Sequence, residues 1–227
     1  MFSQPDLCVA AIFAHPDDEV LGAGASLARH AAAGQRVETL IVSAGLDSRG
    51  DADAEAHAAL KAEAHAAAAC LGISPQHFAD LPDNQLDSVP FLRVVQTVER
   101  FVSAVRPAII YTHHTGDLNI DHRLVHQAVV TACRPLAGSS VRRILAGEVL
   151  SSTEWQSADM VPFQPTVWHD VRETLACKVA AMAAYANEAR PFPHPRSAEA
   201  IEALARFRGV QGGFPAAEAF VLVKEFA

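Results

Sequence analysis

Short, mainly apolar segments alternate with longer segments of helical composition in the first half of the chain, and this alternation limits the fold more than any other feature. Residues 7–13 (LCVAAIF) and 36–42 (RVETLIV) suit strands that a sheet buries on both faces. Residues 19–34 and 54–71 have helical composition, and a glycine stands where each helix would end. Strands separated by helices predict right-handed crossovers and a largely parallel sheet.

The alternation continues, less regularly, to the end of the chain. The other predicted elements are a weak strand at 76–79, a helix at 91–105, strands at 108–112, 143–150 and 166–171, helices at 173–187 and 198–207, and a strand at 219–223. The predicted fold class is α/β: a Rossmann-like, largely parallel sheet flanked by helices, with a less regular C-terminal portion. We expect one domain over residues 1–227, with a core at 1–134 and an elaboration at 135–227.

The charge and composition of the chain exclude several classes of partner. The formal net charge is −8, and no run of Lys or Arg offers a footprint for nucleic acid or an anionic membrane. No stretch of about 18 apolar residues occurs, and the first residues lack the pattern of a secretion signal. The four scattered cysteines predict reduced thiols. We expect a cytoplasmic protein that binds neither nucleic acid nor membrane, while a homo-oligomer stays open.

Two polar clusters follow predicted strands and contain residues that suit a metal. His15, Asp17 and Asp18 follow the strand at 7–13, and His122 ends a polar segment after the strand at 108–112. Because the carboxyl ends of parallel strands meet at one edge of a sheet, we expect the clusters to converge there. Two imidazoles and a carboxylate with one open position are typical of a catalytic zinc site, and His15, Asp18 and His122 supply that set.

Two further aspartates have predicted roles beside these ligands. Asp17 would deprotonate a water molecule that zinc has made more acidic, and Asp121 would orient a ligand imidazole. The competing interpretation of the aspartate pair at 17–18 is a polar turn that caps the following helix.

The two clusters also resemble a known family. Ala14-His15-Pro16-Asp17-Asp18-Glu19 and Asp117-Leu118-Asn119-Ile120-Asp121-His122-Arg123 are similar to the motifs of the PIG-L or LmbE-like N-acetylglucosaminyl deacetylases, and the similarity extends to residues 81–85 and, more loosely, to 208–209 and 217–220. The resemblance implies one deacetylase domain that removes an N-acetyl group from an amino sugar with Zn²⁺. It implies zinc ligands at His15, Asp18 and His122 and a general base at Asp17.

Asn119 departs from the family pattern, because many members have a histidine at this position. An asparagine donates a hydrogen bond to an oxyanion but supplies no proton, which leaves the general acid open. The candidates are His114, His113 and Asp17 once it is protonated. For His114, the alternative is a loop imidazole that is hydrogen-bonded to backbone.

Candidate substrate contacts lie in three predicted loops. Arg49 and Asp83 follow predicted strands, and Arg196 ends a Pro-rich segment at 190–196 that would cover a cleft. Ordinary surface residues of turns would look the same.

Two other functions compete with zinc-dependent deacetylation of a small N-acetylated sugar. One is a magnesium-dependent phosphoester hydrolase that uses the aspartate pair, although imidazole ligands favour zinc. The other is a non-catalytic metal- or sugar-binding protein on the same scaffold. The sequence does not identify the sugar.

Overall fold

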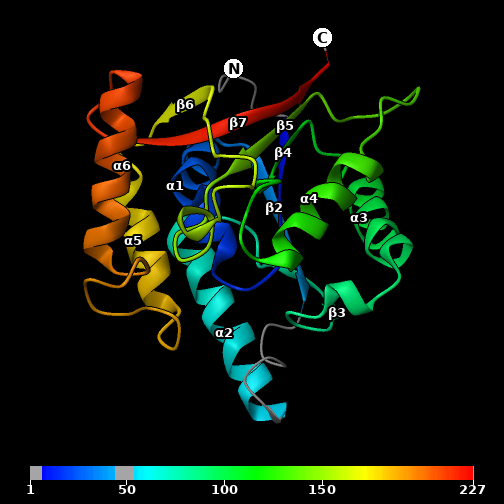
Figure 1. Cartoon of the computed structure of the whole chain (residues 1–227), viewed down its shortest axis with the longest axis horizontal. Helices are drawn as coiled ribbons and strands as arrows, with labels where there is room; N and C mark the ends of the chain where they lie inside the picture. Colours follow the sequence, from blue (N-terminus) through cyan, green and yellow to red (C-terminus); the bar gives the residue numbers. More distant parts are fainter. Residues whose placement is uncertain (1–6, 44–53, 227) are drawn as a thin grey trace.

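The computed structural model describes residues 7–43 and 54–226, which form one seven-stranded sheet with helices on both faces (Figure 1). The sheet order is β3-β2-β1-β4-β5-β7-β6. The strands are β1 (Cys8–Phe13), β2 (Arg36–Ser43), β3 (His77–Leu81), β4 (Ile109–His113), β5 (Arg143–Gly147), β6 (Val167–Asp170) and β7 (Ala217–Glu225). The pairs from β3 to β5 are parallel, whereas β7 runs antiparallel to both of its neighbours. The predicted α/β class and largely parallel sheet are confirmed.

Helices cover the two faces of the sheet in separate groups. The helices are α1 (Asp18–Ala32), α2 (Ala54–Leu71), α3 (Phe91–Val105), α4 (Ile120–Ala132), α5 (Leu175–Ala184) and α6 (Ala198–Gly212). Helices α1, α2 and α5 pack together on one face, and α3 and α4 on the other. No helix in the described ranges is long and apolar enough to span a bilayer.

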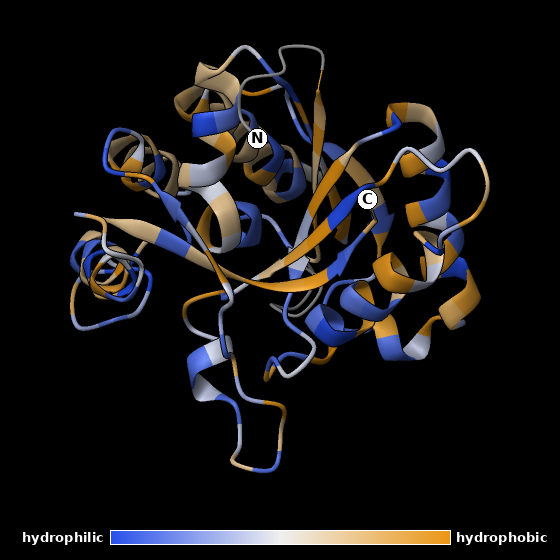
Figure 2. Ribbon diagram, turned by 90° about the horizontal axis from the view of Figure 1, so that it is seen from above, coloured by the Kyte–Doolittle hydropathy of each residue, from blue (hydrophilic) through white to orange (hydrophobic). Residues whose placement is uncertain are grey.

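The central position of β1 in the sheet explains why its sequence is apolar throughout. Val9, Ala11 and Phe13 pack into the core under α1 and α2, while Ala10 and Ile12 pack under α3 and α4. Successive side chains of a strand point to opposite faces, so a strand covered on both sides needs apolar residues throughout. Figure 2 shows these central strands as hydrophobic ribbons between helices that alternate in hydropathy.

Several element boundaries differ from the predicted ones. The strand predicted at 143–150 ends at Gly147, and residues 148–155 instead turn through a short 3-10 helix, η3 (Thr153–Trp155). The helix predicted at 198–207 continues to Gly212, where Gly213 adopts a left-handed conformation (φ 76°). The last strand is longer than predicted, since β7 pairs with both β5 and β6.

A buried ion pair in the C-terminal portion is hydrogen-bonded to the backbone of α1. Lys178 Nζ of α5 lies 2.7 Å from Glu218 Oε1 of β7 and donates to the carbonyl of Leu21. Glu218 in turn accepts hydrogen bonds from the amides of Ala25 and Ser26. The helix that begins at Asp18 is thus held in its middle by charged groups from two elements far along the chain.

Candidate metal centre

The loop after β1 turns three polar side chains toward the carboxyl edge of the sheet. Asp17 has a left-handed backbone (φ 93°), which is uncommon outside glycine and indicates a position that the surroundings enforce. Glu19 contributes to this enforcement, because its fully buried carboxylate accepts a hydrogen bond from the Asp17 amide and is itself bound by Tyr185 and Gln76. The carbonyl of Asp17 accepts hydrogen bonds from the first turn of α1, so the turn and the helix start form one unit.

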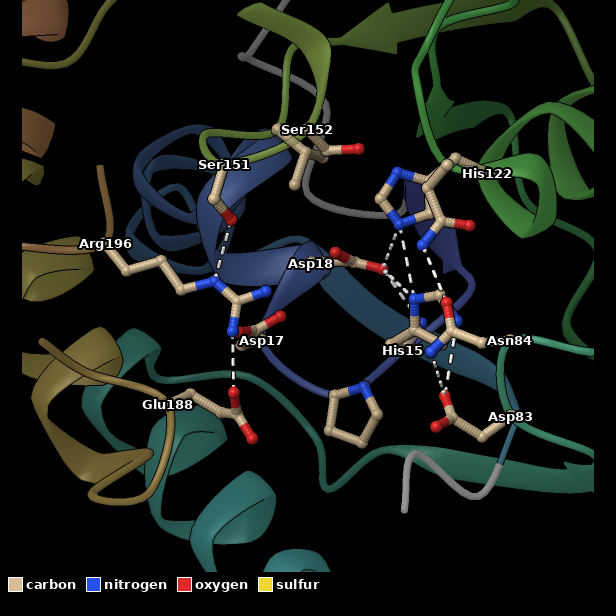
Figure 3. Close-up of a pocket in the computed structure, with 13 residues that line it drawn as sticks. His15, Asp17, Asp18, Asp83, Asn84, His122, Ser151, Ser152, Glu188 and Arg196 are labelled. Carbon is tan, nitrogen blue, oxygen red and sulfur yellow. Dashed lines mark hydrogen bonds and ion pairs between the residues drawn. The ribbon is translucent and has the colours of Figure 1, made fainter. Parts of the chain in front are cut away.

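Three potential ligand atoms converge between this turn and the start of α4 (Figure 3). Asp18 Oδ2 lies 3.2 Å from His15 Nδ1 and 3.1 Å from His122 Nε2, and the two ring nitrogens are 3.2 Å apart. Ligands at about 2.0 Å from a tetrahedral zinc ion are separated by about 3.3 Å. The two imidazoles and the carboxylate thus fit three corners of such a site, and all three residues line a cavity.

The charges around the two imidazoles favour a cation at this point. Burial lowers the pKa of His15, but hydrogen bonds to Asp121 and Asp18 outweigh it and raise the pKa to about 10. For His122, burial likewise lowers the pKa, while Asp18 and Asp117 raise it to about 9. In the metal-free protein protons would occupy this negative site, and a bound metal ion would replace them.

Carboxylates hold the outward nitrogens of both histidines. Asp121 Oδ2 lies 3.2 Å from His15 Nε2, and Asp83 Oδ1 lies 3.4 Å from the same nitrogen. The other oxygen of Asp121 accepts a hydrogen bond from the Leu86 amide, which fixes the carboxylate. Asp121 therefore contacts the imidazole of His15, and a residue that orients this ring would make such a contact.

Asp117 plays the corresponding part for His122, which the sequence analysis did not anticipate. Its Oδ1 lies 3.1 Å from His122 Nδ1, and its carboxylate accepts hydrogen bonds from Ser152, Thr153 and the Asn119 amide. Burial raises the pKa of Asp117, but His122 reverses this effect and the pKa falls to about 2. Asp117 belongs to the motif at 117–123, but its partners Ser152 and Thr153 lie in a loop that no sequence pattern links to this site.

Asp17 contacts Arg196 at one side of the cavity (Figure 3). Arg196 Nη1 lies 3.0 Å from Asp17 Oδ2 and 2.6 Å from Glu188 Oε2, and Arg196 Nε donates to Ser151 Oγ. Burial raises the pKa of Asp17 well above its usual value, and the guanidinium counteracts this effect. The structure thus places Arg196, predicted as a substrate contact, on the predicted general base. Glu188 and Ser151 complete this arrangement and were not predicted from the sequence.

Asn119 has a structural task at the start of α4. Its side-chain oxygen caps the helix by accepting a hydrogen bond from the Asp121 amide, and its Nδ2 donates to Asn84 Oδ1 at 2.9 Å. Asn119, Asn84 and Asp83 all line the cavity. Asp83 and Asn84 lie on the side of the cavity opposite Arg196 and Glu188 (Figure 3), and Asn119 contacts Asn84 there.

Two of the histidines considered from the sequence, His113 and His114, do not line the cavity. His114 is not among the residues that line the cavity; its Nδ1 accepts a hydrogen bond from the Gly116 amide, and burial lowers its pKa to about 4. His113 Nε2 accepts a hydrogen bond from the Ala14 amide, and its ring stacks on His122. Arg49 lies outside the described residues.

The cavity has a volume of about 110 Å³, enough for several water molecules or an acetamido group. Its remaining lining residues are Pro16, Val149, Ser151 and Ser152. It lies beyond the carboxyl ends of β1 and β4, where open parallel sheets bind their ligands.

Comparison with known proteins identifies relatives of this arrangement. A family model described as PIG-L, GlcNAc-PI de-N-acetylase, matches residues 10–133. The uncharacterized deacetylase YaiS from Escherichia coli (strain K12) is 32% identical over 169 residues, which are 73% of this chain and 82% of YaiS.

Solved structures share the fold at lower identity. The N,N′-diacetylchitobiose deacetylase from Pyrococcus horikoshii superposes with a TM-score of 0.75 at 17% identity, covering 95% of this chain and 83% of the other. GalB, the 4-carboxy-2-hydroxymuconate hydratase from Pseudomonas putida KT2440, superposes with a TM-score of 0.77 at 21% identity, covering 97% of this chain and 98% of the other. The same architecture therefore supports a deacetylase and a hydratase, and the fold alone does not assign a reaction.

Proposed function

The chain belongs to the PIG-L family of GlcNAc-PI de-N-acetylases and is a deacetylase of that family, and on this premise we propose that it is a zinc-dependent hydrolase that removes an N-acetyl group from an amino-sugar-containing small molecule. The main support is the convergence of His15 Nδ1, Asp18 Oδ2 and His122 Nε2 within 3.2 Å of one another, beside Asp17 in a small polar cavity. The family resemblance predicted from the two motifs is confirmed.

We assign the metal to this trio, because its donors match the preference of zinc. When bound, zinc would polarise the acetamide carbonyl and lower the pKa of a water molecule toward neutrality. Magnesium prefers oxygen donors and keeps several waters, so two imidazoles support zinc over the magnesium-dependent phosphoester hydrolase.

Asp17 carries both proton transfers in this mechanism. As the water oxygen adds to the acetamide carbon, Asp17 accepts the proton that the water releases. As the C–N bond breaks, Asp17 returns this proton to the nitrogen, and the products are acetate and a free amine. We give Asp17 the second role as well because His114 does not line the cavity and Asn119 has no proton to give.

Arg196 and Asn119 position the reacting groups. Arg196 holds the Asp17 carboxylate on one side of the cavity through a contact of 3.0 Å. Asn119 Nδ2 carries two hydrogens, and within the described residues it donates one of them to Asn84, so the second would be available for the acetamide oxygen. Asp83 and Asn84 would receive sugar hydroxyls on the same side.

Replacement of Asp17 by Asn tests the assignment most directly. We expect Asp17→Asn to keep its metal, because the three ligands are untouched, and to lose turnover by about 10²- to 10⁴-fold. Acetate release from a panel of N-acetylated sugars and metal content by mass spectrometry are the two measurements. The matched control is Asp80→Asn on β3, an exposed aspartate that pairs with Lys61.

Three results would contradict the proposal. Normal turnover by Asp17→Asn would remove Asp17 from the mechanism. Magnesium without zinc in protein purified without added metal would favour the phosphoester hydrolase. A metal-loaded protein that releases no acetate from any sugar of the panel would favour a binding protein on this scaffold.

A further inference from the structure

The turn that follows α5 approaches Asp17 from two directions. It spans residues 185–189 and contains two buried polar side chains, those of Tyr185 (0% exposed) and Glu188 (4% exposed). The carbonyl of Tyr185 accepts hydrogen bonds of 2.9 Å from the amides of Glu188 and Ala189, which joins the two side chains in one turn. This turn belongs to the C-terminal portion of the chain, and Tyr185 lies 166 positions after Glu19, which it contacts.

The first connection reaches the backbone of Asp17 through Glu19. The Tyr185 hydroxyl donates a hydrogen bond of 2.6 Å to Glu19 Oε1, and Gln76 Nε2 donates to the same oxygen at 3.0 Å. Burial raises the pKa of Tyr185 well above its usual value, so the hydroxyl keeps its proton and remains a donor. The other oxygen, Glu19 Oε2, accepts a hydrogen bond of 3.1 Å from the Asp17 amide. Tyr185 and Gln76 therefore orient the carboxylate that holds the Asp17 backbone.

Asp17 depends on such a contact because of its backbone conformation. Its φ of 93° lies in the left-handed region, which a residue with a Cβ adopts only where the surrounding structure enforces it. Without the contact to Glu19, the backbone would relax toward an ordinary conformation, and the carboxylate of Asp17 would move with it.

The second connection reaches the side chain of Asp17 through Arg196. Glu188 Oε2 lies 2.6 Å from Arg196 Nη1, and the same nitrogen lies 3.0 Å from Asp17 Oδ2 (Figure 3). The guanidinium thus lies between the carboxylate of the turn and the carboxylate of the proposed base. The backbone and the side chain of Asp17 are therefore both held from the turn at 185–189.

The metal-ligand candidates close to Asp17 in the chain are fixed by other contacts. The His15 amide donates to Asp18 Oδ2 at 2.9 Å, and the Asp18 amide donates to the His15 carbonyl at 3.3 Å. Asp121 Oδ2 lies 3.2 Å from His15 Nε2. Loss of the Tyr185 hydroxyl should therefore disturb Asp17 and leave the ligand atoms in place.

We propose that Tyr185 is a positioning residue for the deacetylation, which fixes the backbone of Asp17 through Glu19 and its side chain through the turn at 185–189. This inference rests on the proposed function and deepens it. A general base works only within hydrogen-bonding distance of the proton that it accepts, and a displacement of about 1 Å costs about 10²-fold in rate. The residues that match the family model, 10–133, include Asp17 and the three ligands, while the turn that positions Asp17 comes from the C-terminal portion.

Tyr185→Phe tests the proposal, because it removes only the hydroxyl. We expect kcat for acetate release to fall by about tenfold, while KM and the zinc dissociation constant stay within about twofold of the native values. The matched control is Tyr111→Phe, in the other tyrosine of the chain, whose buried hydroxyl is hydrogen-bonded to His30 and does not line the cavity. This control should keep its kcat, and thermal unfolding checks that both variants are folded.

Combination with Asp17→Asn separates positioning from a general structural role. If Tyr185 acts through Asp17, Tyr185→Phe should lower the residual turnover of the Asp17→Asn protein by less than about twofold. An equal loss in both backgrounds would overturn the proposal. If Tyr185→Phe does not fold, Glu188→Gln tests the same turn by the same comparison, because it weakens the pair with Arg196.

Hydrogen exchange provides a measurement that needs neither zinc nor turnover. In the metal-free protein, the Asp17 amide proton should exchange about tenfold faster in Tyr185→Phe than in the native protein, as followed by NMR. The Leu86 amide, which donates to Asp121 at the same site, should keep its exchange rate. Tyr111→Phe should change neither rate.

The outcomes distinguish this inference from the proposed function. An unchanged exchange rate at Asp17, or faster exchange with an unchanged kcat, would overturn the positioning role while deacetylation stands. If no sugar of the panel releases acetate, the proposed function fails, and exchange at Asp17 still decides whether Tyr185 holds this part of the backbone.

Discussion

Asp117 is the residue on which the position of His122 depends. It is completely buried, and its carboxylate joins His122 Nδ1 to the hydroxyl groups of Ser152 and Thr153. A carboxylate on the outer nitrogen of a metal-binding histidine fixes the ring and increases its basicity.

We therefore expect Asp117→Asn to weaken zinc binding by about 10- to 100-fold, because the amide retains the shape but not the charge. Competition against a chromogenic chelator gives the dissociation constant without reference to catalysis. Asp159→Asn, at a fully exposed position, is the control. An unchanged zinc affinity in Asp117→Asn would show that the contact with His122 is structural only.

Arg196 contacts Asp17, the proposed general base, through a group that is both charged and planar. Its guanidinium contacts Asp17, Glu188 and Ser151 with two of its nitrogens. Arg196→Met should lower kcat by about 10- to 100-fold with zinc affinity unchanged, because Asp17 loses its positioning partner. Arg196→Lys keeps the positive charge but not the planar guanidinium with its several donors, so it should recover part of kcat. If the lysine variant behaves like the methionine variant, shape rather than charge holds Asp17.

Site residues that lie together in a sequence motif could be predicted. Site residues that come together only when the chain folds could not. His15, Asp17 and Asp18 are neighbours in the chain, and His122 follows a strand next to β1. Asp117 and Ser151 have partners more than 30 positions away, and no local pattern connects them. Glu188 meets Arg196 within the loop between α5 and α6, but only the fold brings this loop to Asp17. The direction of the Arg196 side chain, toward Asp17, likewise depends on how its loop folds back.

Among the elements, α1 links the candidate metal centre to the C-terminal portion. It begins at Asp18, and the Lys178–Glu218 pair binds its backbone at Leu21, Ala25 and Ser26. Breaking a buried ion pair on one side leaves the other charge without compensation.

Lys178→Met should therefore destabilise the protein by about 3–5 kcal/mol, measured by urea unfolding. The double variant Lys178→Met/Glu218→Gln should recover part of this loss, because no buried charge is left unpaired. Lys61→Met removes a solvent-exposed partner of Asp80 and should cost less than about 1 kcal/mol. A loss of similar size for Lys178→Met and Lys61→Met would show that the buried pair contributes no more than a surface pair.

Element types were predictable wherever the pattern was long and regular. The helices at 54–71 and 91–105 have the predicted bounds, since their composition and the residues that follow them are unambiguous. The segment 148–155 was placed in part in a strand because it is apolar at Val149 and Leu150. In the structure it leaves the sheet, and its Ser152 and Thr153 side chains bind Asp117.

The molecule as a whole contains a second group of buried polar residues, none of which lines the cavity. His30 contacts Gln35 and Tyr111, and His169 contacts Ser26. Burial lowers the pKa of His30 to about 4 and that of His169 to about 3. Both rings are neutral in the folded protein at pH values where the unfolded chain, with a histidine pKa near 6.5, binds protons.

The free energy of unfolding should therefore fall as the pH decreases from about 6.5 to 4, by about 1.4 kcal/mol per pH unit for each of these histidines. Glu19 opposes this trend, because burial raises its pKa to about 7 and the folded state holds its proton. His30→Gln should reduce the slope of the free energy of unfolding against pH by about 1.4 kcal/mol per pH unit, the contribution of one proton, as measured by urea unfolding at a series of pH values. Identical slopes for the variant and the native protein would contradict a neutral buried His30.

The arrangement of the whole sheet was predictable only for its parallel part. Alternating strands and helices imply neighbouring parallel strands, and β1, β2 and β4 follow this rule. The insertion of β7 between β5 and β6 depends on pairing such as Leu145 with Leu222, between residues far apart in sequence. Hydrophobic patterning predicts where each strand lies in the sequence, but it does not predict which strand pairs with it when the two are far apart in the chain.

This sheet order has a consequence for how the protein forms during translation. β6 lies at the edge of the sheet with β7 as its neighbour, and β7 leaves the ribosome after it. Until then β6 has no strand to join, and α1 lacks the carboxylate of Glu218. Because synthesis proceeds at about 5–20 residues per second, a nascent chain that has already made β1 to β5 waits several seconds before the turn at residues 15–18 is supported by the complete sheet.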